Sequence, residues 1–257
     1  MISISPELQI VLSAGLWHGA MVFLRVSALV SLLPAFGDRS VPARVKLGLS
    51  VAFTMIVAPA IPAIPAPESV IAMAGFAMSE VGIGLALGFG IRMFVLVLQT
   101  AGSIAAQSTS LSQILGGAGV EPVPAIGFVL VVGGMALAVM AGLHMRAAAF
   151  LIASYDLLPF ATVPDGRQMS QWGLRQVSQG FSLAFLLAAP FVIASVIYNL
   201  TLGVINRAMP QLMVAFVGAP VVTFGGLFLL FLSAPTMLAV WEDALAMFLQ
   251  NPTGIVR

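Results

Sequence analysis

The stretch Ser69–Leu98, SVIAMAGFAMSEVGIGLALGFGIRMFVLVL, contains only two ionisable side chains, Glu80 and Arg92. About 20 consecutive apolar residues suffice for a helix to cross a bilayer, so this stretch predicts a membrane-spanning helix. The whole chain has the same character: its 257 residues are 60% hydrophobic and 7% charged, and its mean hydropathy is +1.11. A soluble domain is about 25% charged. The composition therefore excludes a soluble enzyme, a nucleic-acid-binding protein and a disordered regulator.

Five further apolar runs accompany the first. They cover residues 8–37, 47–60, 122–153, 168–205 and 212–241. Together the six runs predict an all-α integral membrane protein of about six hydrophobic helices, rich in glycine and proline, in a single membrane domain over residues 1–257. Pro190, Pro220 and Pro235 lie inside the last two runs, where proline is expected to interrupt or bend a helix.

The residues typical of catalytic and metal sites are nearly absent from the sequence. There is no cysteine, and the two histidines, His18 and His144, are far apart in the chain. The sequence lacks a Gly-x-Ser-x-Gly motif, a phosphate-binding loop and a His-Glu-x-x-His motif. The net charge of +1 gives no bias toward nucleic acid. We therefore expect a protein that binds or conducts, not an enzyme, without a cofactor or a metal.

The segment Gln99–Gly119 is polar but carries no charge. Nine of its first fifteen residues are Ser, Thr or Gln. Irregular polar backbone at membrane depth is tolerated only where protein buries it or where it lines a wet cavity. One interpretation is a loop that lines or plugs a channel, and the other is an exposed loop between two spans. An uncharged lining would suit the passage of diverse polypeptides, because no ion pair would trap them.

Four ionisable residues interrupt apolar runs: Arg25, Glu80, Arg92 and Arg146. Each would cost about 2.5–3.5 kcal/mol at a lipid-facing helix centre, so we expect all four to face protein or water. Glu80 and Arg92 are twelve residues apart in one run and project about 120° apart on a straight helix. Pairing between helices or snorkelling is one interpretation of these charges, and a proton or ion relay is the other.

Small residues are concentrated in the same run. Gly82, Gly84, Gly88 and Gly90 fall in one predicted helix, and Gly84 and Gly88 form a small-xxx-small pair. Such residues let helix backbones approach closely where lipid provides no hydrophobic driving force. We expect them to pack tightly, within the chain or against a partner subunit.

The segment Asn199–Pro220 resembles the FliR family, the membrane subunits of the flagellar type III export gate. The resemblance rests on a turn that reads Gly-hydrophobic-hydrophobic-Asn-Arg-x-x-Pro-Gln and a Gly-x-Pro step that follows it. Gly142–His144 and Ser154–Pro159 are similar to further family positions, and the six-span layout agrees over essentially the whole chain.

This resemblance implies an architecture and a task. The chain would be a fusion of a FliP-like part, residues 1–165, with a FliQ-like helical hairpin, residues 166–257. It would complete a helical ring with FliP and FliQ in the bacterial inner membrane, in the flagellar basal body. That ring is the pore for exported flagellar proteins, with FlhB around its cytoplasmic side and FlhA as a further partner.

The resemblance also assigns roles to two segments. Residues 107–117 match the loop that plugs the closed pore, and residues 206–211 match the tip of the hairpin. The plug residues are Gln107, Ser108, Ser110, Leu111, Ser112, Gln113, Ile114, Leu115, Gly116 and Gly117. The turn residues are Asn206, Arg207, Pro210 and Gln211.

The sequence departs from the family at two places. Leu111, Ile114 and Leu115 stand where family plugs often carry phenylalanine, and Val221 stands where the family often has a lysine. The injectisome homologue has a similar turn and is the alternative branch. A small-molecule secondary transporter and a passive membrane scaffold are the alternative functions.

Overall fold

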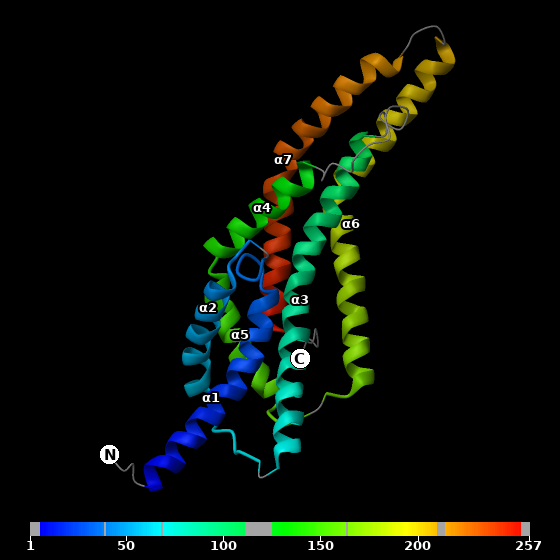
Figure 1. Cartoon of the computed structure of the whole chain (residues 1–257). Helices are drawn as coiled ribbons and strands as arrows, with labels where there is room; N and C mark the ends of the chain where they lie inside the picture. The colour runs from blue at the N-terminus through cyan, green and yellow to red at the C-terminus, as the bar shows by residue number, and fades with distance from the viewer. Residues whose placement is uncertain are drawn as a thin grey trace. The chain divides into compact units, whose positions relative to one another are not determined.

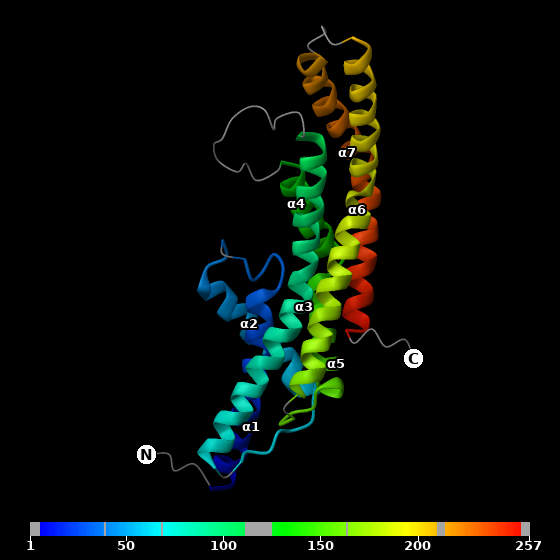
Figure 2. The same ribbon diagram turned by 90° about the vertical axis from the view of Figure 1, so that its right-hand side faces the viewer.

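The computed structural model describes residues 6–38, 40–67, 69–110, 125–162, 164–209 and 214–252. Every regular element within these ranges is a helix, as Figures 1 and 2 show. The elements are α1 (Pro6–Leu32), α2 (Ala43–Val57), the 3-10 turn η1 (Ala58–Ala60), α3 (Val70–Ser110), α4 (Ala125–Met140), α5 (Leu143–Leu157), α6 (Gly166–Ala208) and α7 (Val214–Gln250). Five helices are long and apolar enough to cross a membrane, and the bent pair α4–α5 gives up to six spans. The prediction of an all-helical membrane protein with about six spans is confirmed.

Helix α3 continues past the expected end at Leu98 as far as Ser110. The first half of the polar segment is therefore helical and not a loop. Its hydroxyl groups bond back to the helix itself: Ser103 Oγ donates to the carbonyl of Gln99 at 2.9 Å, and Ser108 Oγ donates to the carbonyl of Ile104 at 2.8 Å. Because these bonds satisfy the side chains locally, a hydroxyl-rich sequence is compatible with the helix.

The fourth predicted span is broken where the prediction has one run. Gly142 has φ +80°, a left-handed conformation that favours glycine, and the chain turns by 71° between α4 and α5. The three prolines that the sequence suggested as breaks do not end a helix. Pro190 lies inside α6, and Pro220 and Pro235 lie inside α7, so none of them ends its helix.

The chain divides into two compact units, and the three longest helices contribute to both. The first unit contains residues 1–92, 139–174 and 247–257, and the second contains residues 93–138 and 175–246. In the first unit, the core is formed by fully buried side chains of α1, α3 and α5, including Leu29, Ile83 and Phe150. Phe150 also packs at 5.8 Å between ring centroids against Phe248, near the end of α7.

In the second unit, Trp241 anchors α7 to α3. Its indole is 1% exposed, and Nε1 donates a hydrogen bond of 2.8 Å to the carbonyl of Phe94. Glycine residues also let the backbones of α3 and α4 approach closely. A Cβ atom on Gly102 would collide with the backbone of Gly127, whereas a Cβ on Gly127 would lie 3.6 Å from the nearest atom of Gly102, an ordinary contact. Gly102 is thus the position that depends on having no side chain.

Candidate functional site

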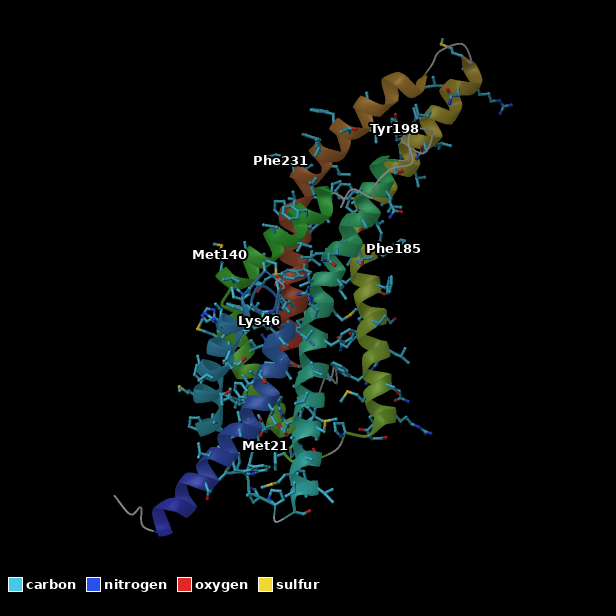
Figure 3. All side chains as sticks on the ribbon, in the orientation of Figure 1. Met21, Lys46, Met140, Phe185, Tyr198 and Phe231 are labelled. Atoms are coloured by element: carbon cyan, nitrogen blue, oxygen red, sulfur yellow. The ribbon has the colours of Figure 1, made fainter. Side chains whose placement is uncertain are left out.

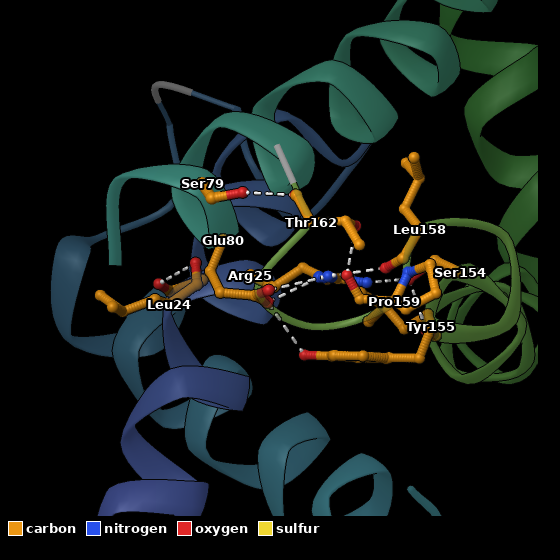
Figure 4. Close-up of polar contacts among 11 residues, drawn as sticks. Leu24, Arg25, Ser79, Glu80, Ser154, Tyr155, Leu158, Pro159 and Thr162 are labelled. Atoms are coloured by element: carbon orange, nitrogen blue, oxygen red, sulfur yellow. Dashed lines mark hydrogen bonds and ion pairs between the residues drawn. The ribbon is translucent and has the colours of Figure 1, made fainter. Parts of the chain in front are cut away.

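A buried ion pair joins α1 to α3 in the first unit, as Figure 4 shows. Arg25 Nε donates to Glu80 Oε2 at 2.7 Å, and Arg25 Nη2 donates to Glu80 Oε1 at 2.9 Å. Both side chains are 0% exposed. This two-bond geometry is the strongest arrangement available to a guanidinium and a carboxylate. It explains how two charges are accommodated in two apolar helices.

Helix α5 and the residue after it complete the cluster. Arg25 Nη1 donates to Ser154 Oγ at 3.2 Å, and Nη2 donates to the carbonyl of Leu158 at 3.0 Å. The ring of Tyr155 covers the guanidinium, with Arg25 Cζ 3.7 Å from its centroid, and the Tyr155 hydroxyl donates to Glu80 Oε2 at 3.3 Å. A buried pair is tolerable only when such additional bonds satisfy the remaining donors and acceptors. The cluster therefore fastens three helices together, and its four side chains, Arg25, Glu80, Ser154 and Tyr155, are all buried.

The sequence predicts Arg25 and Glu80 as intramembrane charges but does not predict their α5 partners. A signal was present, because Ser154, Tyr155 and Leu158 all lie in the segment Ser154–Pro159 that resembles the family. The positions that looked like a family signature are those that bind the buried arginine.

The other two predicted charges lie in different surroundings. Arg92 Nη1 pairs with Asp38 Oδ1 at 2.6 Å, and the two side chains are 32% and 29% exposed. Asp38 follows α1, and the sequence alone does not predict it as the partner of Arg92. Arg146 is half-buried in α5. Among these charges, Arg25 thus pairs with Glu80, whereas Arg92 pairs with Asp38.

His18 holds the proline-rich turn that follows α2. The backbone N–H of Ile64 donates to His18 Nδ1 at 3.2 Å, so Nδ1 is the acceptor and Nε2 is the donor to the carbonyl of Ala58 at 2.8 Å. Trp17 Nε1 adds a hydrogen bond of 3.3 Å to the carbonyl of Pro65. The turn borders an apolar cleft of about 450 Å³ that Phe76, Tyr155 and the prolines line.

Three of the four α3 glycines predicted to pack tightly lie against other parts of the chain, and the fourth does not. A Cβ on Gly84 would collide with the backbone carbonyl of Arg25, and one on Gly88 would lie 3.0 Å from Leu32 Cβ. A Cβ on Gly90 would lie 2.5 Å from the ring of Phe248. Gly82, in contrast, is exposed and meets nothing within 4 Å among the described residues. Tight packing within the chain therefore does not extend to Gly82, which turns to the other side of the helix.

The predicted plug lies mostly outside the described residues. Gln107, Ser108 and Ser110 belong to the last turns of α3, so the expected loop boundary at residue 107 is corrected to a position after Ser110. Gln107 is exposed and Ser108 is half-buried. The remaining plug residues lie outside the described ranges: Leu111, Ser112, Gln113, Ile114, Leu115, Gly116 and Gly117.

The hairpin turn is described only on its α6 side. Asn206 and Arg207 are exposed in the last turn of α6, while Pro210 and Gln211 lie outside the described residues. A cation at this end is favoured by the negative end of the helix dipole. No group of three His, Asp or Glu side chains within the described ranges could hold a metal ion.

Known proteins match nearly the whole chain. The family model for bacterial export proteins, family 1, matches residues 16–248. The flagellar biosynthetic protein FliR of Caulobacter vibrioides is 33% identical over 228 residues, which cover 87% of this chain and 91% of that protein. The FliR proteins of Escherichia coli and Bacillus subtilis are 30% and 26% identical and cover 80% and 78% of this chain, and 80% and 79% of their own lengths.

The matched region contains the buried cluster, the glycine contacts and the polar end of α3. The match therefore relates the fold core, and not a single motif, to these proteins. This chain belongs to the bacterial export proteins of family 1, and it is a membrane subunit of the flagellar type III export gate.

Proposed function

We propose that this chain assembles with FliP and FliQ into a helical ring in the bacterial inner membrane, within the flagellar basal body. In this proposal FlhB surrounds the cytoplasmic side, and FlhA and exported flagellar proteins are further partners. The chain contributes binding surfaces and a passage, not catalysis. The flagellar names of its relatives support this assignment.

The observation that carries the proposal is the large apolar surface of α6 and α7. In the apolar stretch that could cross a membrane, only 22% is buried within the structure for α6 and 17% for α7. The corresponding share for α3 is 56%. Phe185 and Phe231, labelled in Figure 3, are 60% and 78% exposed. Neighbouring subunits or membrane lipid must cover such a surface, because so many large exposed apolar side chains do not remain in water.

We assign residues 166–257 as the FliQ-like hairpin and residues 1–165 as the FliP-like part. The segment 107–117, whose first four residues are the end of helix α3, is the plug that blocks the lumen of the closed pore. Its polar start at the end of α3 supports this role, because Gln107 is exposed and an exposed amide within a membrane needs a wet or protein-lined environment.

Affinity purification of the full-length tagged chain from membranes in mild detergent tests the assembly. FliP and FliQ should co-purify in a stable complex, and the chain should restore motility to a strain that lacks its own FliR protein. Recovery of the chain alone, with a solute transported by it in liposomes, would instead identify a small-molecule transporter.

Deleting residues 107–117 tests the plug separately. The complex should still assemble, and ion leak through it should rise. An assembled complex whose leak is unchanged would leave the chain a scaffold subunit and would refute the plug.

A further inference from the structure

Helix α2, in the first unit, has one packed face and one exposed face. Its packed face, against α1 and α5, carries the buried side chains Ser50, Phe53 and Val57. Its large apolar side chains on the outside are 38–71% exposed: Val45, Leu47, Val51, Met55 and Ile56. Only 22% of the apolar stretch Ala43–Ala60 is buried within the structure. An apolar neighbour must therefore cover the outside of this helix.

The outer face of α2 begins with a cation. Arg44 is exposed, and Leu47, Val51 and Met55 follow it three, seven and eleven residues later, which places all four side chains on one side of the helix. Gly48 lies among them, and a Cβ atom there would meet nothing within 4 Å. Eleven residues rise about 16 Å along a helix. The outer face therefore extends over about one leaflet, which is half of a hydrocarbon core about 30 Å thick.

No acidic side chain neutralises the start of α2. Lys46, labelled in Figure 3, donates from Nζ to the carbonyl of Gly37 at 2.9 Å. Asp38 is the only acid between α1 and α2, and its carboxylate is paired with Arg92 at 2.6 Å. Within the described ranges, neither Arg44 nor Lys46 forms an ion pair with a carboxylate. The start of α2 thus carries two positive charges beside an uncovered apolar face.

We propose that the outer face of α2 binds one anionic phospholipid, with the lipid phosphate at Arg44 and an acyl chain along Leu47, Val51 and Met55. A cation followed by an apolar surface one leaflet long matches the order of headgroup and acyl chain in a phospholipid. A guanidinium binds a phosphate group with two parallel hydrogen bonds. The second charge, on Lys46, favours an anionic headgroup over a zwitterionic one. An apolar partner helix alone would leave the guanidinium without an acceptor, whereas a phospholipid satisfies both parts of the face.

Native mass spectrometry of the full-length tagged chain, purified with its partners in mild detergent, tests this site. The complex is titrated with phosphatidylglycerol, phosphatidylcholine or inorganic phosphate, and the fraction that retains each compound is measured. Arg44→Gln removes the cation, and Val51→Gln interrupts the apolar part of the face. Arg167→Gln is the matched control, because Arg167 is also exposed in the first unit but lies two residues from the exposed carboxylate of Asp165.

One phosphatidylglycerol should be retained per copy of the chain, in preference to phosphatidylcholine. Arg44→Gln should weaken this binding about fivefold, the factor that corresponds to the roughly 1 kcal/mol that one cation contributes near an anionic membrane surface. Val51→Gln should also weaken it, and Arg167→Gln should leave it unchanged. Equal retention of phosphatidylcholine, equal loss in Arg167→Gln, or an unchanged affinity in Arg44→Gln would overturn the inference. Displacement of the lipid by inorganic phosphate would identify a site for a free anion instead and would overturn it too.

Photo-crosslinking in intact membranes tells lipid from protein at this face. A photo-reactive phenylalanine analogue placed at Leu47, which is 56% exposed, should crosslink to phospholipid. Crosslinks to a partner subunit alone would show that protein covers the outer face of α2, and the lipid site would be wrong. Co-purification with FliP and FliQ and motility are measured for the same variants. They report on the export assembly, so that failure of the lipid site and failure of the assembly are distinguished.

Discussion

Replacing Glu80 by glutamine should destabilise this protein severely. The substitution keeps the shape of the side chain but leaves the Arg25 guanidinium, 0% exposed, without its counter-charge. Removing one partner of a buried pair costs about 3–5 kcal/mol. Arg25→Met should cost a similar amount, because it leaves the Glu80 carboxylate buried and deprives Ser154 and Leu158 of their donor.

The double variant Arg25→Met/Glu80→Gln removes both charges at once. Its loss of stability should be smaller than the sum of the single losses by about 0.5–3 kcal/mol, the range found for residues in direct contact. The half-exposed pair Arg92–Asp38 provides the control. Asp38→Asn should cost about 1 kcal/mol or less, because solvent screens a pair that it reaches.

Denaturant unfolding of the purified chain in mild detergent, followed by tryptophan fluorescence, measures these differences. Where a single variant does not accumulate, the midpoint of thermal aggregation in isolated membranes provides the same ranking. Two results would show that the Arg25–Glu80 ion pair does not stabilise the first unit as described. One is a double variant whose loss of stability equals the sum of the two single losses, and the other is an Asp38→Asn variant that is as destabilised as Glu80→Gln.

Three other predictions follow from close contacts. Gly102→Ala should separate α3 from α4 and lower stability, whereas Gly127→Ala should be tolerated, as thermal aggregation midpoints of the two variants would reveal. Gly84→Leu should reduce the amount of chain that co-purifies with its partners, whereas Gly82→Leu should leave folding of the chain intact. Equal damage by the two variants would contradict the assignment of Gly84 to the packed face and Gly82 to the open face. His18→Phe removes two hydrogen bonds worth about 1 kcal/mol each and should increase proteolytic cleavage within residues 58–67, with an unchanged cleavage rate as the contrary result.

Hydropathy predicted the spans well because bilayer thickness sets the length of an apolar helix. It misplaced the end of α3, where composition indicated a loop at Gln99 and the helix continues to Ser110. A hydroxyl that bonds to the carbonyl four residues earlier allows polar residues to stay helical, and composition does not register that bond. The hydropathy pattern also did not predict the break at Gly142, since no proline lies at that position and the residues on both sides of it are apolar.

The sequence predicted the two charged residues of the candidate site but not the residues that they contact. The cost of burying Arg25 and Glu80 in apolar runs is evident from the sequence, yet the two residues are 55 positions apart and their α5 partners are more than 100 positions from Arg25. Pairing depends on which helices become neighbours. The plug residues from Leu111 to Gly117 lie outside the described ranges, and their role stays a prediction.

The amino-acid sequence alone determined the membrane class, the number of apolar spans and the resemblance to an export family, because these follow from composition and order. Only the tertiary structure decided that Gly84 is packed while Gly82 is open, and that Ala101 is buried while Gln99 is exposed. Helix periodicity fixes the angle between two residues on one helix, but the neighbouring helices determine which of the two faces is covered.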